Sequence, residues 1–184
     1  MSQGIEILES GTSEEKIKIL ETLEITDDSK IVNKIINCLD DPDIKVRGEA
    51  FSSLVLNKNK ISKFLIDSLK DSRKNIRGFA ALVLANRNDT SSFPAIMELV
   101  KDEHSMVRSC ALGALGHLRA KEAKHIIHNC ILDSNIEVRK SALQALINLD
   151  EKISEKELLE ISKEKDVELK QLIIKMKKSG PEGI

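Results

Sequence analysis

A short motif that returns about every 31 residues limits the fold of this chain more than any other feature. Its copies begin at Asp41, Asp71, Asp102 and Asp133, and an arginine follows each aspartate by six residues, at Arg47, Arg77, Arg108 and Arg139. Successive arginines are therefore 30, 31 and 31 residues apart. A nearly constant period of this length is typical of repeat proteins, in which each unit packs against the next.

Each copy also carries an apolar stripe with helical spacing. In the first copy Val46, Ala50 and Leu54 are four residues apart, and the other copies have valine or isoleucine, alanine and leucine at the same positions. Residues with this spacing lie on one face of an α-helix. The stripe is therefore predicted to be the buried face of the helix that follows each aspartate.

Weaker copies at both ends extend the pattern to six such helices. They are predicted near 13–24, 43–56, 73–86, 104–118, 135–149 and 166–178, with further helices between them at 28–39, 60–69, 91–100, 121–132 and 154–162. Asp41 before Pro42 suits an N-cap followed by the first helical residue. We predict an all-α, right-handed α-solenoid of about five helical hairpins plus a C-terminal closing helix, forming a single repeat domain over residues 1–184.

The pattern D-x-x-x-x-[VI]-R-x-x-A-x-x-x-L resembles the HEAT-like repeats first described in phycobilisome lyases. The resemblance covers nearly the whole chain, and it implies that the helix after each aspartate is the second of its hairpin and lines a concave face. Two relatives in fold have catalytic sites that this sequence does not match. The His-Glu pairs of deoxyhypusine hydroxylase are absent, and so are the tryptophan and tyrosine of the alkylpurine DNA glycosylases.

The repeated aspartates and arginines are predicted to form a structural ladder. An aspartate before a helix can accept hydrogen bonds from free backbone N–H groups. The arginines can reach aspartates of their own repeat or of a neighbouring one. The alternative is a row of arginines that binds anions.

Composition argues against several classes of function. The formal net charge is −1, so no bulk excess of positive charge favours nucleic acid. The chain has no tryptophan or tyrosine to stack on bases or sugars. No apolar run is long enough for a membrane span, and the N-terminus does not resemble a signal peptide, so the expected location is cytoplasmic.

No catalytic residue, metal site or cofactor is predicted. His125, His128 and Cys130 lie on one predicted helix, but the cysteine points away from the histidines and a further ligand would have to come from elsewhere. The three cysteines are widely spaced, and the sequence has no phosphate-binding loop or nucleophile elbow. We therefore expect a protein that is not an enzyme.

One stretch of the predicted concave face is unusually apolar. The repeats can be aligned on their aspartates, so that equivalent positions on the helix face opposite the core are compared. These positions form polar surfaces in the outer copies. In the two central copies they hold Phe79 and Leu82, and then Met106 and Cys110. The hypothetical partner-binding set is Asn75, Phe79, Leu82, Met106, Cys110 and His117. An exposed apolar patch bordered by polar groups is typical of a peptide-binding surface. The alternative is that Phe79 is buried between repeats.

These features predict a non-catalytic scaffold or adaptor that binds a segment of an unidentified protein partner. One alternative is an accessory or lyase-like protein that holds a small ligand in the groove. Another is nucleic-acid binding through the arginine ladder, which the charge balance disfavours.

Overall fold

The computed structural model describes residues 2–23, 25–163 and 165–178, and within those residues every regular element is a helix. The chain divides into two compact units, Met1–Ser92 and Phe93–Ile184. The first contains α1 (Ser2–Ser10), α2 (Ser13–Leu20), α3 (Ser29–Asn37), α4 (Ile44–Leu56), α5 (Ser62–Ser68) and α6 (Lys74–Asn86). The second contains α7 (Phe93–Glu98), α8 (Ser105–His117), α9 (Lys124–Cys130), α10 (Ile136–Asn148), α11 (Glu155–Ile161) and α12 (Val167–Lys178).

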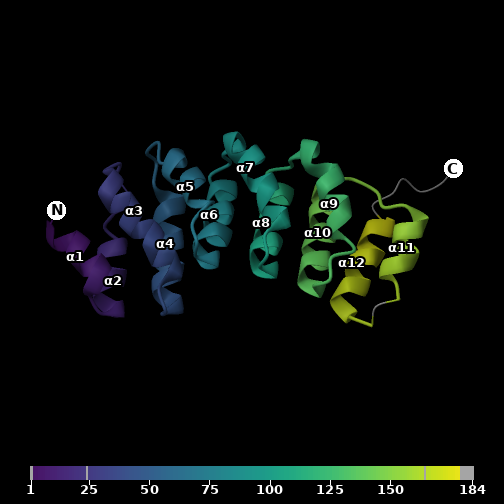
Figure 1. Cartoon of the computed structure of the whole chain (residues 1–184), viewed down its shortest axis with the longest axis horizontal. Helices are drawn as coiled ribbons and strands as arrows, with labels where there is room; N and C mark the ends of the chain where they lie inside the picture. Colours follow the sequence, from purple (N-terminus) through teal and green to yellow (C-terminus); the bar gives the residue numbers. More distant parts are fainter. Residues whose placement is uncertain (1, 24, 164, 179–184) are drawn as a thin grey trace. The chain divides into compact units, whose positions relative to one another are not determined.

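Helical hairpins build each unit (Figure 1). In the first unit α1 packs on α2, α3 on α4 and α5 on α6, and the second helices α2, α4 and α6 lie side by side. In the second unit α7 packs on α8 and α9 on α10, while α8, α10 and α12 form the corresponding row. Stacked hairpins of this kind form an α-solenoid, so the predicted fold class is confirmed. That the two units act as a single domain stays a prediction.

The apolar stripe is buried as the repeat pattern predicts. Val46, Ala50 and Leu54 on α4 have at most 1% of their surface exposed. The equivalent residues Ile76, Ala80, Leu84, Val107, Ala111, Leu115, Val138, Ala142 and Leu146 are fully buried. The stripe therefore holds the second helix of each hairpin against its neighbours, and burial of this apolar surface is the main driving force for the stack.

The structure corrects the predicted start of these helices. Asp41 is not an N-cap, because its carboxylate accepts a hydrogen bond from the backbone N–H of Asp43 (2.9 Å), which closes a turn ahead of the helix. Asp43 is the N-cap of α4, and it accepts from the N–H of Lys45. Pro42 lies in the turn, where its missing N–H is not needed. The other three aspartates bind the N–H two residues later in the same way, at Arg73, His104 and Asn135.

The N-terminal helix α1 is an addition to the prediction. The sequence pattern predicts no helix before residue 13, yet Ser2–Ser10 is helical and packs on α2 and α3. Thr12 and Glu15 then form a capping box that starts α2. The first repeat is consequently a complete hairpin. Helix α2 ends at Leu20, short of the predicted residue 24, which lies outside the described residues.

Three of the second helices share one ending. After α6, α8 and α10 a single residue adopts a left-handed backbone conformation, with φ of 54° at Asn88, 51° at Arg119 and 57° at Asp150. The next N–H in each case reaches back to a helix carbonyl at 3.0 Å: Asp89 to Leu84, Ala120 to Leu115 and Glu151 to Leu146. These bonds satisfy carbonyls that the end of a helix would otherwise leave free, and they fix the turn into the next repeat.

Candidate interaction site

An apolar groove lies between α4 and α6 in the first unit. It has a volume of about 320 Å³. It is lined by Ile44, Arg47, Gly48, Phe51, Phe79 and Leu82, which together are called the α4–α6 groove below. A groove with four large apolar side chains and one cationic side chain suits an apolar protein segment better than a polar small molecule.

Gly48 gives the groove its depth. A Cβ atom at this position would meet nothing within 4 Å, so the space above the α4 backbone is open. Phe51, one turn further along α4, is partly exposed, and so is Phe79 across the groove on α6. Ile44 at the beginning of α4 is 71% exposed. Such exposure of large apolar side chains around a hollow costs solvation free energy that a bound partner could recover.

Two of the residues singled out in the sequence line this groove, and a third lies beside it. Phe79 and Leu82 line the wall formed by α6. Phe79 is partly exposed and so is not buried between repeats. Asn75, at the start of the same helix, instead donates a hydrogen bond to the Asp40 carboxylate at 2.8 Å.

The opposite wall was missed by the sequence comparison. It consists of Ile44 and Phe51 with Gly48 between them, all on α4. The repeats were aligned on their motif aspartates, and the same positions were taken in each one. On α4 those positions are mainly polar. A groove between two adjacent helices, however, is lined by the sides that face one another. These sides correspond to different positions of the repeat on the two helices. This wall could have been predicted from the sequence by searching the adjacent positions on α4, where a glycine lies between two large apolar residues.

The other half of the predicted set belongs to α8 in the second unit. Met106 and Cys110 are partly exposed, and their sulfur atoms are 3.6 Å apart. Burial raises the pKa of the Cys110 thiol to about 11, so this cysteine is a weak nucleophile at neutral pH. His117 is exposed at the end of the helix. That these residues act together with Phe79 stays a prediction.

Each ladder arginine binds the turn at the start of its own helix. One guanidinium nitrogen donates to the carbonyl of the motif aspartate at 2.7–2.9 Å and to the next carbonyl at 2.9–3.4 Å. The four arginines are Arg47, Arg77, Arg108 and Arg139. Each arginine thus ties the turn before a helix to the second turn of that helix.

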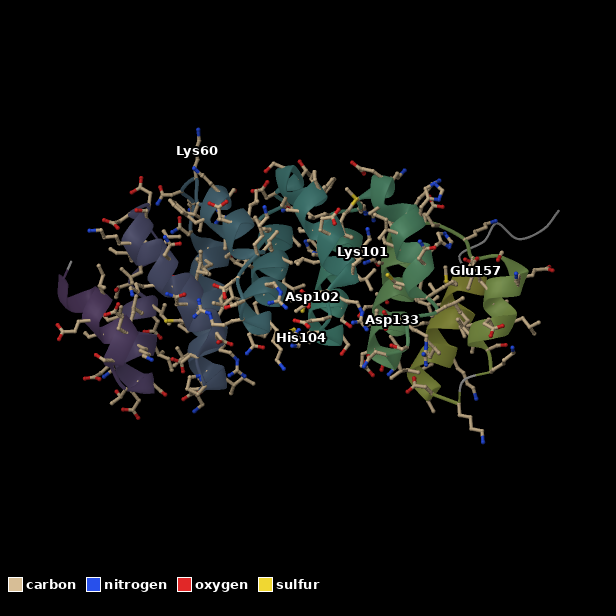
Figure 2. The ribbon with its side chains drawn as sticks, in the orientation of Figure 1. Lys60, Lys101, Asp102, His104, Asp133 and Glu157 are labelled. Carbon is tan, nitrogen blue, oxygen red and sulfur yellow. The ribbon has the colours of Figure 1, made fainter. Side chains whose placement is uncertain are left out.

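Some ladder residues also link neighbouring repeats. In the first unit the Lys16 ammonium lies 2.7 Å from the Asp41 carboxylate. In the second unit Arg108 makes a two-pronged contact with Asp133, with both N–H···O distances at 2.8 Å. Figure 2 labels Asp102 and Asp133, which precede α8 and α10. Two-pronged pairs combine charge with fixed geometry, so these contacts can set the spacing between repeats.

The Arg108–Asp133 pair predicts a specific dependence of stability on pH. Burial opposes the charge on Asp133, but hydrogen bonds from Arg108 and from the N–H of Asn135 hold the pKa of this carboxyl below its ordinary value. The carboxylate therefore stabilises the fold above about pH 4, and this contribution is lost as the pH falls through the lower pKa of the folded state. We expect Asp133→Asn to lower the free energy of unfolding at pH 7 by about 1 kcal/mol.

Urea melts between pH 7 and pH 3 measure this difference. The gap between wild type and Asp133→Asn should shrink as the pH falls, because a protonated aspartate resembles asparagine. Glu122→Gln, at an exposed glutamate, is the control and should follow the wild type throughout. A gap that stays constant down to pH 3 would show that the charge of Asp133 does not contribute.

The family assignment follows from the repeat. Residues 62–147 match the sequence model for HEAT repeats. This segment of the chain carries HEAT-like repeats. The predicted resemblance is confirmed, and the motif arginines Arg77, Arg108 and Arg139 fall within the matched residues.

Solved structures similar to this chain include both natural and designed proteins. A crystal structure of an engineered protein has a TM-score of 0.59 and 17% identity, covering 97% of this chain and 96% of that chain. The complex of CpcE and CpcF of phycocyanin lyase from Nostoc sp. PCC7120 has a TM-score of 0.58 and 19% identity, covering 93% and 73%. A designed armadillo repeat protein in complex with the peptide (KR)4 has a TM-score of 0.58 and 15% identity, covering 96% and 98%. No curated protein matches the sequence.

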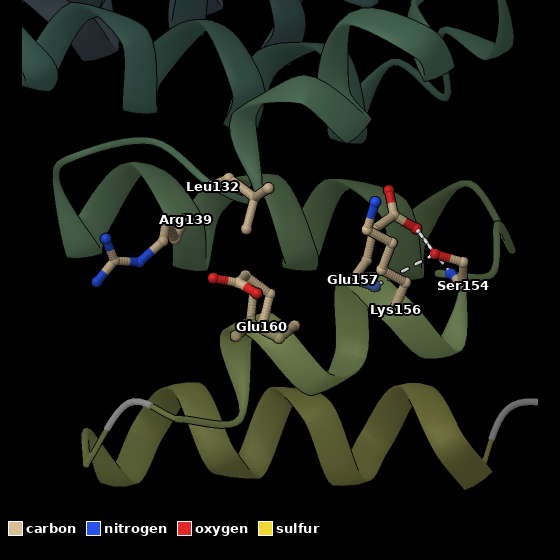
Figure 3. A pocket seen from close by; sticks show the side chains of 7 residues that line it. Leu132, Arg139, Ser154, Lys156, Glu157 and Glu160 are labelled. Carbon is tan, nitrogen blue, oxygen red and sulfur yellow. Dashed lines mark hydrogen bonds between the residues drawn. The ribbon is translucent and has the colours of Figure 1, made fainter.

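The chain has a second, larger pocket of about 680 Å³ in its second unit (Figure 3). Four of its seven lining residues are charged, and two of these, Arg139 and Glu157, make contacts within the chain. Glu157 accepts hydrogen bonds from Ser154 in the capping box of α11 and lies 3.2 Å from His128. Arg139 donates to the carbonyl of Asp133. These contacts engage Arg139 and Glu157 within the repeat.

The remaining chemical groups do not come together. Cys130 is buried, and burial raises the pKa of its thiol, while His125 on the same helix is exposed. Among the described residues no three histidine, cysteine, aspartate or glutamate side chains are grouped as metal ligands would be. Within the same part of the chain no helix has the length and apolar character needed to cross a bilayer.

Proposed function

We propose that this chain is a non-catalytic scaffold that binds an apolar segment of a protein partner in the α4–α6 groove. The observation that carries the proposal is the open, apolar hollow above Gly48, with Phe51 and Phe79 on its two sides. Aromatic side chains in a hollow are favourable anchors for a partner. Repeat proteins of this type commonly bind proteins, and one similar structure is a designed armadillo protein bound to a peptide.

The alternatives have less support from the geometry. Phycocyanin lyase shares the fold, but the α4–α6 groove offers no polar group other than Arg47 to orient a small polar ligand. Nucleic acid would need arginines directed towards phosphates. Each ladder arginine instead directs one guanidinium nitrogen to backbone carbonyls of its own turn, and Arg108 also gives its other two nitrogens to Asp133.

Filling the groove should abolish partner binding without unfolding the protein. Gly48→Phe places a ring in space that is empty, so the variant should fold, while the partner's apolar side chain is excluded. Gly48→Ala is the matched control. Its single methyl group leaves most of the hollow open, and alanine in a helix is more stable than glycine by about 0.5–1 kcal/mol.

A library of random peptides, linked through their C-termini so that no free terminal carboxylate is present, can supply the ligand. We expect selection on the wild type to enrich peptides that also bind Gly48→Ala but bind Gly48→Phe at least about tenfold more weakly. Phe79→Asp should weaken the same peptides, with folding checked by circular dichroism. Peptides that bind all four proteins equally would place the interaction elsewhere.

A further inference from the structure

Arg47 differs from Arg108 because the aspartate that should pair with it is already bound by another residue. The ladder pairs a cation with the aspartate of the next repeat, as in Lys16–Asp41 and Arg108–Asp133. For Arg47 the corresponding aspartate is Asp71. Asp71, however, is held by Arg73, whose guanidinium donates to both carboxylate oxygens at 2.9 and 2.8 Å.

Arg73 is peculiar to this repeat. The residue two positions after the motif aspartate is Asp43, His104 or Asn135 in the other copies, and none of these has a guanidinium. The backbone N–H of Arg73 also donates to Asp71, and its guanidinium reaches Asn37 at 2.7 Å. The hydrogen bonds from Arg73 hold the pKa of Asp71 below its ordinary value, so this carboxylate is charged and fully engaged at neutral pH.

The outer edge of the Arg47 guanidinium is therefore available. One of its nitrogens, Nη1, donates to the carbonyls of Asp41 and Pro42 at 2.7 and 3.1 Å. In the described part of the chain, Nε and Nη2 make no hydrogen bond or ion pair, whereas the same two atoms of Arg108 hold Asp133. Arg47 also lines the α4–α6 groove, so this free edge belongs to a side chain in the wall of the groove.

Charged groups of both signs lie around Arg47. Asp41 is paired with Lys16, and Asp43 binds the N–H of Lys45. The pKa of Asp43 is lowered by a hydrogen bond with Ser13, by the N–H of Lys45, and by the positive charges of Lys45 and Arg47, but Asp43 makes no hydrogen bond to Arg47. Lys45 and Lys74 are exposed in the first turns of α4 and α6, where the helix dipoles also favour an anion.

We propose that the partner of the α4–α6 groove carries an aspartate or glutamate side chain next to one or two large apolar side chains. The apolar side chains fill the hollow above Gly48, and the carboxylate takes the place at Arg47 that Asp71 would occupy in a regular repeat. The inference rests on the proposed function, because it names the chemistry of the segment bound there. A planar guanidinium whose Nε–H and Nη2–H groups are free is suited to a carboxylate, and a lysine-rich segment would be repelled.

The groove-dependent peptides selected above test this inference, since their C-termini carry no free carboxylate. We expect them to contain aspartate or glutamate within a few residues of leucine, isoleucine or phenylalanine. In fluorescence anisotropy, replacing that acidic residue by its amide should weaken binding to the wild type by about tenfold and leave binding to Arg47→Gln unchanged.

A second pair of variants leaves Arg47 itself intact. Arg73→Ala releases Asp71 to pair with Arg47, so it should weaken the acidic peptide about as much as Arg47→Gln does. Adding Asp71→Asn to Arg73→Ala removes the competing carboxylate and should restore the affinity. Circular dichroism melts check that each variant is folded.

The outcomes separate the two proposals. Two results would overturn the carboxylate inference and leave the groove as a binding site. One is that the groove-dependent peptides contain no acidic residue. The other is that the acid-to-amide replacement weakens binding equally for the wild type and for Arg47→Gln. If no selected peptide depends on Gly48, the proposed function fails, and the inference fails with it.

Discussion

Leu115→Ala is expected to lower the free energy of unfolding by about 2–5 kcal/mol. Leu115 is the third residue of the buried stripe on α8, and none of its surface is exposed. Its backbone carbonyl also accepts the N–H of Ala120, so the residue lies close to the turn into the next repeat. Truncation leaves a cavity that rigid neighbouring helices fill only in part.

Urea unfolding followed by circular dichroism measures this loss. Leu159→Ala is the matched control, because it removes the same atoms from a leucine on α11 that is 67% exposed. The control should change stability by less than about 0.5 kcal/mol. Equal losses for the two variants would mean that Leu115 does not lie in the core of the second unit.

Gly116→Ala is expected to destabilise the protein by about 1–3 kcal/mol, although alanine is normally the better helix residue. A Cβ atom on Gly116 would lie 2.7 Å from the Cα and 2.9 Å from the Cβ of Ala145 on α10. Both atoms belong to the core of the neighbouring helix and cannot rotate away. The two helices would therefore have to separate.

The same substitution at Gly48 supplies the comparison. The Cβ atom of Gly48→Ala meets open space, so this variant should stabilise the protein by about 0.5–1 kcal/mol. The two Gly→Ala substitutions are therefore expected to change the free energy of unfolding in opposite directions. Denaturant melts of both variants against the wild type show the difference directly. A stabilising Gly116→Ala would contradict the close approach of α8 and α10.

The periodic part of the sequence predicted the fold well, because burial follows spacing. Ala80 and Leu84 are buried where the repeat places them, since a stripe at four-residue spacing has one inward face. Local turn chemistry was harder to predict. Asp41 was expected to cap its helix, but its carboxylate has two competing donors, the N–H of Asp43 and the ammonium of Lys16. The second of these donors lies 25 residues away in the sequence.

The candidate site was only half predictable for a related reason. Phe79 stood out because the equivalent position holds Glu49 in the preceding repeat. Ile44 and Phe51 belong to a different column, and only the packing of α4 against α6 shows that the two columns face one another. The free edge of Arg47 depends on Arg73, a residue of another repeat whose effect is visible only through its contacts with Asp71.

Chemical-shift mapping by nuclear magnetic resonance tests the central claim most directly. A groove-dependent peptide from the selection would be titrated into isotope-labelled wild-type protein. We predict the largest shift changes at the backbone amides of Gly48, Phe51, Phe79 and Leu82, with little change in α10 and α12. Changes concentrated outside α4 and α6 would contradict the assignment of the α4–α6 groove as the binding site.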